Sequence, residues 1–483
     1  MKFALAWRGL RLRGLAWLAG VLLLPFPAIG AQTSPNAPVV ITVATFLAGV
    51  SANHPVARQA RLGVDQAREE QRIARGAFDP AVSADWDRKT FGTVAYYDYL
   101  TAALLVPTPL GIDVKLGFER TSGAYISPDR RTPSRGLLTA GLSIPIGTRI
   151  LADERRTALT VARALRDGAV ADRDGTVNRV LLSATRDYAR WFEAEQRVAI
   201  ANEGMRLAEF RFAAVRRRVA NGEAAALDTI EAALEIARRD VQRAEAAQAR
   251  FAARLSVETY LWDARGMPDT LRSDAVPSAE YVPTERTDTA SVSALVASAL
   301  RSHPDIQRAD ARIAQAAAQS RLASLQRVPS LAANVTALGG ADDGLSLTPA
   351  MDDAKLGLSF RTPLLLMQAR GRANVAEIRT DQALLDRDRT RREVSAVLRT
   401  AASEVETVAR TLSLQRTVVS YARALVRGEQ LRFDAGEGTL FLVNTRERAL
   451  LDEELRLAGI EARRLIAFGE LAVARGGWTV PSR

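Results

Sequence analysis

The sequence predicts a mainly α-helical fold with a β part, built from two copies of one unit. Two repeated landmarks indicate the duplication. Both histidines of the chain, His54 and His303, precede a proline and lie 249 residues apart. A Gly-Glu pair at Gly222 recurs at Gly436, 214 residues later. Because the landmarks keep the same order, each half is expected to contain a helix, strands and two long helices joined by a turn.

Two long stretches without proline predict the long helices. Residues 146–267 and 364–480 contain no proline, and each has one strong turn signal, at Gly222 or Gly436. Proline breaks helix interiors, so Ala-, Leu-, Arg- and Glu-rich stretches that lack it favour helix. A helix over residues 149–220 would be roughly 100 Å long at about 1.5 Å per residue. Such a helix needs a coiled-coil partner along its whole length.

Residues 1–30 have the pattern of a secretory signal peptide. Basic residues precede an apolar run over residues 15–24, and small residues occupy positions 28 and 30 before the expected cleavage site. An uncleaved membrane anchor is the alternative, which the short apolar run and the prolines after it disfavour. Residues 31–50 contain further prolines and are expected to form an extended N-terminal segment.

The first repeat is expected to span residues 51–266. Its first helix should begin at the first His-Pro pair, because proline suits the first helical position. Strands are expected over about 80–145, where apolar and polar residues alternate. A helical hairpin follows, with its tip at 219–224, where Gly222 can take the left-handed conformation that ends a helix.

The second repeat is expected to span residues 291–475, after an irregular, proline-containing linker at 267–290. The same signals place its strands at about 330–361 and the tip of its hairpin near 433–440. Residues 476–483 are expected to form a C-terminal tail.

The second helix of each hairpin carries apolar residues at steps of three and four, which predicts a coiled-coil seam. The seam of the second repeat contains Leu451, Leu455, Ala458, Ala462 and Leu465. The seam of the first repeat contains Leu227, Ile230, Leu234, Ala237, Val241, Ala244, Gln248, Phe251 and Leu255.

The alternating segments allow two interpretations. Alternation with period two suits a half-buried sheet and equally a membrane β-barrel with lipid outside and water inside. Aromatic residues gathered over 86–125 favour the barrel, whose membrane interfaces carry such residues. The first strand region is longer, because 60 residues separate Pro80 from Gly141 and 27 separate Pro329 from Gly357. The additional piece could extend the barrel outward, cap it or add strands.

The composition argues against several classes of function. The chain has no cysteine, so no disulfide, thiolate metal site or lipidated cysteine is expected. No catalytic or cofactor-binding motif is found, and neither histidine has partners at ligand spacing, so neither an enzyme nor a metal site is expected. The net charge of +11 is distributed over helices that carry both signs, so nucleic acid is not an expected partner.

The order of the motifs resembles the TolC family of outer-membrane efflux channels. The segments RGAFDPAVSA and VPSLAANV resemble the start of the two family repeats, and GLSIP and GLSFRTPL resemble the strand that leads into each long helix. The segments NGEAAALDTIEA and AGEGTLFLVNTRE resemble the two helix-turn tips of the family. The resemblance covers nearly all of the chain after the signal peptide.

The resemblance implies a homotrimer in the outer membrane with a large periplasmic part. Each protomer would contribute strands to one shared β-barrel, which contacts outer-membrane lipid, and helical hairpins to a shared periplasmic α-barrel. The implied function is a passive exit duct for small molecules, which an inner-membrane pump delivers through a periplasmic adaptor. Untwisting of the hairpins would open the tunnel mouth.

The resemblance also points to residues of the mouth. In the family, acidic residues six and nine positions past the second tip glycine narrow the tunnel. This chain has Leu442 and Thr445 there, and Asp228 and Glu231 at the same offsets in the first repeat. All four are candidate pore residues, and a threefold ring of the two acidic residues would attract cations. The candidate adaptor-docking tips consist of Asn221, Gly222, Glu223, Gly436, Glu437 and Gly438.

Two alternatives stay open. A channel of type I protein secretion would have the same sequence features, and only neighbouring genes would separate it from an efflux duct. A periplasmic coiled-coil adaptor or scaffold also has a long helical hairpin, but two hairpins with two matched strand regions disfavour it.

Overall fold

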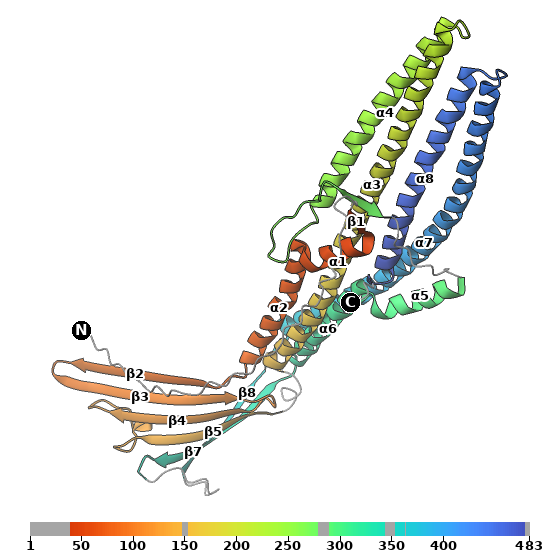
Figure 1. Cartoon of the computed structure of the whole chain (residues 1–483). Coiled ribbons are helices and arrows are strands. Elements are labelled where there is room, and N and C mark those ends of the chain that lie inside the picture. Colours follow the sequence, from red (N-terminus) through yellow and green to blue (C-terminus); the bar gives the residue numbers. More distant parts are fainter. Residues whose placement is uncertain (1–38, 147–152, 279–288, 343–352, 363, 479–483) are drawn as a thin grey trace, which may run out of the picture. The chain divides into compact units, whose positions relative to one another are not determined.

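A computed structural model describes residues 39–146, 153–278, 289–342, 353–362 and 364–478 (Figure 1). The expected signal peptide and residues 31–38 lie outside the described residues, as do residues 479–483 of the expected tail and residues 279–288 of the expected linker. The described chain is mainly α-helical, which confirms that part of the predicted fold class.

Each half of the chain contains short helices, strands and a long helical hairpin (Figure 1). The first half comprises β1 (Val39–Thr42), α1 (Val43–Asn53), α2 (Pro55–Gly76), β2 (Ala81–Phe91), β3 (Val94–Pro107), β4 (Asp113–Ser122), the short 3-10 helix η1 (Pro128–Arg130), β5 (Leu137–Ile146), α3 (Glu154–Ala220) and α4 (Ala226–Glu258). The second half comprises β6 (Ala275–Ser278), α5 (Thr289–Ser302), α6 (Pro304–Leu325), β7 (Ser330–Gly340), β8 (Ala354–Arg361), α7 (Met367–Asp434) and α8 (Leu440–Ala474).

Two predictions about the irregular segments are wrong. Residues 43–50, expected to be extended, belong to α1, because Thr42 caps the helix by accepting a hydrogen bond from the Thr45 N–H at 3.2 Å. Residues 275–278 of the expected irregular linker form β6, which pairs in parallel with β1. The Tyr188 hydroxyl of α3 lies 2.6 Å from the Ile41 carbonyl oxygen and 2.9 Å from the Ser278 carbonyl oxygen. Tertiary contacts therefore order both segments.

The two histidines lie at helix N-termini. The imidazole Nδ1 of His54 accepts a hydrogen bond from the Val56 N–H at 3.3 Å, and Nδ1 of His303 accepts one from the Asp305 N–H at 3.2 Å. Each side chain therefore satisfies one of the donors that the first turn of a helix leaves unpaired. His303 is buried, and His54 is half-buried.

The pH dependence of stability should include a contribution from His303. Burial lowers the pKa of His303 below its usual 6.5, against a smaller opposite effect of the Asp305 carboxylate. Below about pH 6.5 the unfolded chain binds a proton here that the folded chain does not, so folding stability falls as the pH falls. We expect His303→Asn, which keeps a capping side chain, to reduce the loss of thermal stability between pH 7.5 and 5.5. The matched variant His54→Asn, at the more exposed cap, should reduce it less; equal slopes would contradict this account.

Six strands form one antiparallel sheet in the order β2-β3-β4-β5-β7-β8 (Figure 1). The first half contributes four strands and the second half two. Within the protomer, the additional piece of the first half therefore adds strands. No described helix packs across either face of this sheet, and both edge strands, β2 and β8, are exposed along their whole length.

Hydrophobic clusters hold the helices together. One cluster joins α1 and β6 to α3, α4 and α8 around Tyr188 and Trp191, whose side chains are fully buried. A second joins α5 and α6 to α7 and α8 around Leu398. Within the protomer α3 packs against α8, so α4 and α7 are the outer helices of the two hairpins.

The expected seam of α4 does not face its partner helix. Leu227 and Ile230 are 71% and 67% exposed, whereas α4 buries Ala232, Glu235 and Arg239 against its neighbours. Apolar spacing identifies a stripe but not the surface that covers it, and within the described protomer this stripe remains largely exposed. In α8, by contrast, Leu451 and Leu465 of the expected seam are buried within the protomer.

Candidate functional site

The tips of the two hairpins have the same backbone geometry. Gly222 and Gly436 have φ angles of 78° and 79°, the left-handed region that glycine adopts without strain. After each glycine, a glutamate N–H donates back to the long helix: Glu223 to the Arg218 carbonyl at 2.8 Å and Glu437 to the Arg432 carbonyl at 2.9 Å. Both ends are Schellman motifs, which satisfy carbonyls at a helix terminus.

The tip residues are accessible to a partner. Asn221, Gly222, Glu223, Gly436 and Glu437 are exposed, and Gly438 is half-buried. Gly438 lies close to Phe433, because a Cβ atom at this position would be 3.0 Å from the Phe433 backbone nitrogen. The two tips therefore present similar short turns that end in an acidic side chain.

Apolar side chains join the hairpins just beneath the tips. Val215 of α3, Ala232 of α4 and Leu440 of α8 form a small buried cluster. Phe433 of α7 packs against it, and the Arg218 guanidinium lies 5.1 Å from the centre of its ring. All four long helices therefore meet at this level.

Arg211 of α3 and Glu447 of α8 form a buried ion pair between the hairpins. Both terminal nitrogens of Arg211 donate to the Glu447 carboxylate. The guanidinium also donates to the Asn444 Oδ1 of α8 at 3.1 Å and to the Gln430 Oε1 of α7 at 3.5 Å. Arg211 and Glu447 are only 9% and 8% exposed. A charge buried this far needs such partners, since removing it from water is costly.

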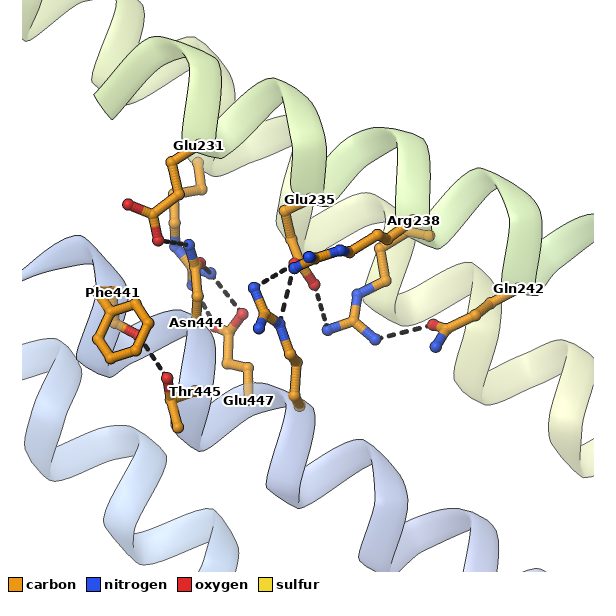
Figure 2. Close-up of polar contacts among 11 residues, drawn as sticks. Glu231, Glu235, Arg238, Gln242, Phe441, Asn444, Thr445 and Glu447 are labelled. Atoms are coloured by element: carbon orange, nitrogen blue, oxygen red, sulfur yellow. Dashed lines mark hydrogen bonds and ion pairs between the residues drawn. The ribbon is translucent and has the colours of Figure 1, made fainter. Parts of the chain in front are cut away.

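A second ion pair lies beside the first and involves α4 (Figure 2). Glu235 of α4 accepts from Arg239 of the same helix at 2.6 Å and from Arg448 of α8 at 2.8 Å. Arg239 donates in turn to the Gln242 Oε1 at 2.9 Å. Glu235 and Arg239 are each 5% exposed. We name Arg211, Glu235, Arg239, Asn444, Glu447 and Arg448 the inter-hairpin polar network.

The structure brings one of the candidate pore residues to this network. Asn444 Nδ2 donates to the Glu231 Oε1 at 3.5 Å, and Glu231 is half-buried. Asp228 lies one turn nearer the tip and is also half-buried, at the start of α4. Leu442 and Thr445 are exposed on α8, and the Thr445 hydroxyl donates to the Phe441 carbonyl at 2.8 Å (Figure 2).

Sequence reasoning missed the polar network, although one signal for it exists. The seam of α8 continues from Leu451 toward the tip through Glu447, Asn444 and Leu440, at the same steps of three and four. Polar residues at such positions are buried between helices and specify how the helices align. The partners Arg211 and Glu235 could not be identified in this way, because many arginines and glutamates occur at helical spacing on α3 and α4.

Within the described ranges, no group of three or more His, Asp or Glu side chains is placed to hold a metal ion. Among the helices that the structure describes, none has both the length and the apolar character needed to cross a bilayer.

Comparison with known proteins confirms the resemblance that the sequence indicated. Residues 295–477 match the model of a family described as outer membrane efflux protein. None of the curated protein sequences matches the chain.

Several solved structures with a similar fold are described as outer-membrane channels. The channel OprN is 18% identical with a TM-score of 0.64, and the match covers 91% of each chain. The open state of the MtrE channel of Neisseria gonorrhoeae is 17% identical with a TM-score of 0.64, and the match covers 90% of this chain and 89% of MtrE. The CmeC channel of Campylobacter jejuni is 13% identical with a TM-score of 0.62, and the match covers 90% and 85%. At such identities the likeness establishes the fold.

Proposed function

We propose that this chain, whose second repeat matches the outer membrane efflux protein family, is the outer-membrane channel of a tripartite efflux system. Three copies would enclose a passive duct, through which small molecules leave after an inner-membrane pump and a periplasmic adaptor have delivered them. The proposal is supported by exposed surfaces of the protomer that a membrane and further copies of the chain would cover.

The observation that carries the proposal is the uncovered amphipathic sheet. Residues opposite each other in antiparallel strands point to the same face. On one face, Val82, Leu104, Leu116, Ala140 and Ala337 form a continuous lane across five strands. The next lane, on the other face, is more polar: beside Leu105 it contains Lys115, Gly141, Thr336 and Lys355. An apolar face without a covering layer and a polar opposite face are what a barrel wall between lipid and water requires.

The edges of the sheet support closure by further copies. Strands β2 and β8 each present unpaired N–H and C=O groups, which in lipid would cost several kcal/mol each. Pairing β2 of one copy with β8 of the next would satisfy both edges and close the wall. Three copies are expected from the family resemblance.

The outer helices α4 and α7 also expose apolar stripes that further copies of the chain could cover. The exposed stripe of α4 begins at Leu227 and Ile230. Helix α7 exposes Leu414, Val418, Tyr421 and Leu425 at steps of three and four. Because α4 and α7 lie on opposite sides of the α3–α8 contact, a head-to-tail ring would bring the α4 stripe of one copy against the α7 stripe of the next.

The function is tested by reconstituting the purified full chain in a planar bilayer, with its mass measured in detergent. A trimer that gives discrete conductance steps is expected. A protein that leaves the membrane without detergent and does not conduct would refute the duct and favour an adaptor or scaffold.

We propose further that Asp228 and Glu231 form a ring at the tunnel mouth. Conduction through a charged ring requires that cations bind weakly enough to leave. Replacing both residues by alanine should raise the cation conductance of the reconstituted channel, because the constriction and its cation-retaining charges are both removed. The control is Leu442→Ala with Thr445→Ala, at the same offsets in the second repeat, which leaves the charge unchanged and should not alter ion selectivity. Unchanged conductance in the acidic variant would exclude these residues from the gate.

The exposed tips are the proposed docking surface for the adaptor. Gly222 and Gly436 set the shape of the two turns, and Glu223 and Glu437 follow them at equivalent positions. Pairs of similar turns on one protomer would offer an adaptor repeated, nearly equivalent contacts around a trimeric ring.

A further inference from the structure

Strands β3 and β4 form a pair inserted into the middle of the sheet. They lie between β2 and β5, and β5 is the strand that pairs with the second repeat. Phe91, the last residue of β2, is opposite Val94, the first residue of β3. At the same end of the sheet, β4 leaves near Ser122, which is opposite Asp98, and β5 begins at Leu137, opposite Glu119. The chain thus enters and leaves the pair at one end, and without the pair β2 could lie antiparallel to β5.

The inserted pair has the dimensions of its neighbours. β3 has 14 residues and β4 has 10, beside 11 in β2 and 10 in β5. A tilted strand of about 9–11 residues crosses a bilayer. The lengths are therefore those of wall strands.

The register of the inserted pair also matches that of its neighbours. Leu104 of β3 and Leu116 of β4 lie in the apolar lane that joins Val82 to Ala140. Ala103 and Gly117, one residue along, lie in the lane that leads to Thr139 on the opposite face. A segment that capped the barrel or plugged its interior would not need to continue the strand pairing and register of the wall.

We infer that the trimer closes a barrel of 18 strands, six from each copy, and that the β3–β4 pair widens its exit. This inference rests on the proposed function, because it takes the sheet as one third of a trimeric barrel. If each copy contributed only two strands per repeat, as the second repeat does, the barrel would have 12. The diameter of a barrel grows with its number of strands, so the two additional strands of each copy would make this barrel wider.

The widening is large. With a strand spacing of about 4.8 Å and a tilt of about 40°, the backbone diameter is roughly 36 Å for 18 strands and roughly 24 Å for 12. Barrels of about 16–18 strands leave an aqueous channel. The exit would thus pass solutes well above small-molecule size, such as polymers of about 20 Å hydrodynamic diameter.

Labelling of single cysteines tests whether β3 is part of the wall. The chain has no cysteine of its own, so each introduced thiol reports without background. Leu104→Cys and Ala103→Cys place thiols on the two faces of β3, and Ala140→Cys and Thr139→Cys are their partners at the same level of β5. The full chain in outer membranes is treated with a water-soluble maleimide, and total thiol is counted after denaturation.

The expected result is that residues 103 and 139 are labelled while residues 104 and 140 are protected by lipid. If labelling alternates in β5 but both β3 positions are labelled, the inserted pair does not lie in the barrel wall. The inference would then be wrong, while the proposed channel function would not be contradicted. Absence of alternation in β5 itself would refute the membrane barrel and with it the proposed function.

Polymer exclusion tests the width. Polyethylene glycol of about 20 Å hydrodynamic diameter, added at the barrel side of the reconstituted channel, should enter and lower the conductance of the unaltered chain. Deletion of residues 94–122 joins β2 to the loop before β5 and should restore exclusion of the same polymer. Exclusion by the unaltered chain would contradict an 18-stranded barrel even if the deletion variant failed to fold.

Discussion

Replacing Arg211 by alanine is expected to destabilise the contact between the hairpins by about 3–5 kcal/mol, because the Glu447 carboxylate is left buried without its cation. The same change removes the hydrogen bond that Asn444 accepts from the guanidinium. In the proposed channel the two hairpins line the tunnel mouth, so their looser contact should raise the open probability. Thermal unfolding in detergent and single-channel recording measure the two effects.

Two controls test whether the effect is specific to the Arg211–Glu447 ion pair or follows from the loss of any charge. Arg206→Ala removes an arginine from the same helix, whose ion pair with Glu203 is exposed, and should change neither readout. Arg211→Met combined with Glu447→Met removes both charges at similar volume and should recover most of the lost stability. If the single variant Arg211→Ala were as stable and as closed as the unaltered channel, the network would have no role in holding the hairpins.

Replacing Trp191 by alanine is expected to cost about 3–5 kcal/mol of stability, since a fully buried aromatic side chain is removed and a cavity remains. The indole packs edge-on against Tyr188 with ring centres 5.7 Å apart, and its N–H donates to the Glu195 Oε1 at 3.1 Å. Because Tyr188 bonds to the carbonyls of Ile41 and Ser278, the pairing of β1 with β6 should loosen as well. Thermal unfolding measures the first effect, and protease sensitivity of the segment near residue 278 measures the second.

The matched variant Trp191→Phe keeps a ring in the core and should lose clearly less stability than alanine. Phe210→Ala, an aromatic residue of the same helix that is 70% exposed in the protomer, provides a surface control. An alanine variant at residue 191 that unfolds at the same temperature as the unaltered chain would show that this core does not limit stability.

Local signals in the sequence were informative where the physical cause is local. The prolines after His54 and His303 mark the starts of helices, because a proline ring fits the first turn of a helix but disrupts the helix interior. Gly222 and Gly436 mark the hairpin turns, because a left-handed residue favours glycine. Period two marked the strand regions at about 80–145 and 330–361, in which β2, β4, β5, β7 and β8 each have one apolar and one more polar face.

Strand β3 shows where this kind of signal fails. Its apolar face carries Leu100 and Leu104, but the opposite face carries Tyr97, Tyr99 and Leu105. With apolar and aromatic residues on both faces, the alternation that marks a half-exposed strand disappears. Only the pairing with β2 and β4 identifies the segment as a strand in the sheet.

By itself, the sequence determined the duplication, the long helices, the turns between them and the resemblance to a channel family, because proline, glycine and residue period act within a few positions of the chain. Only the tertiary structure decided that α4 exposes its apolar stripe while α8 buries its own. Only the structure brought Arg211 to Glu447 and Arg448 to Glu235. Burial and ion pairing depend on which helix lies across the contact, and residues more than 200 positions apart in the chain supply that surface.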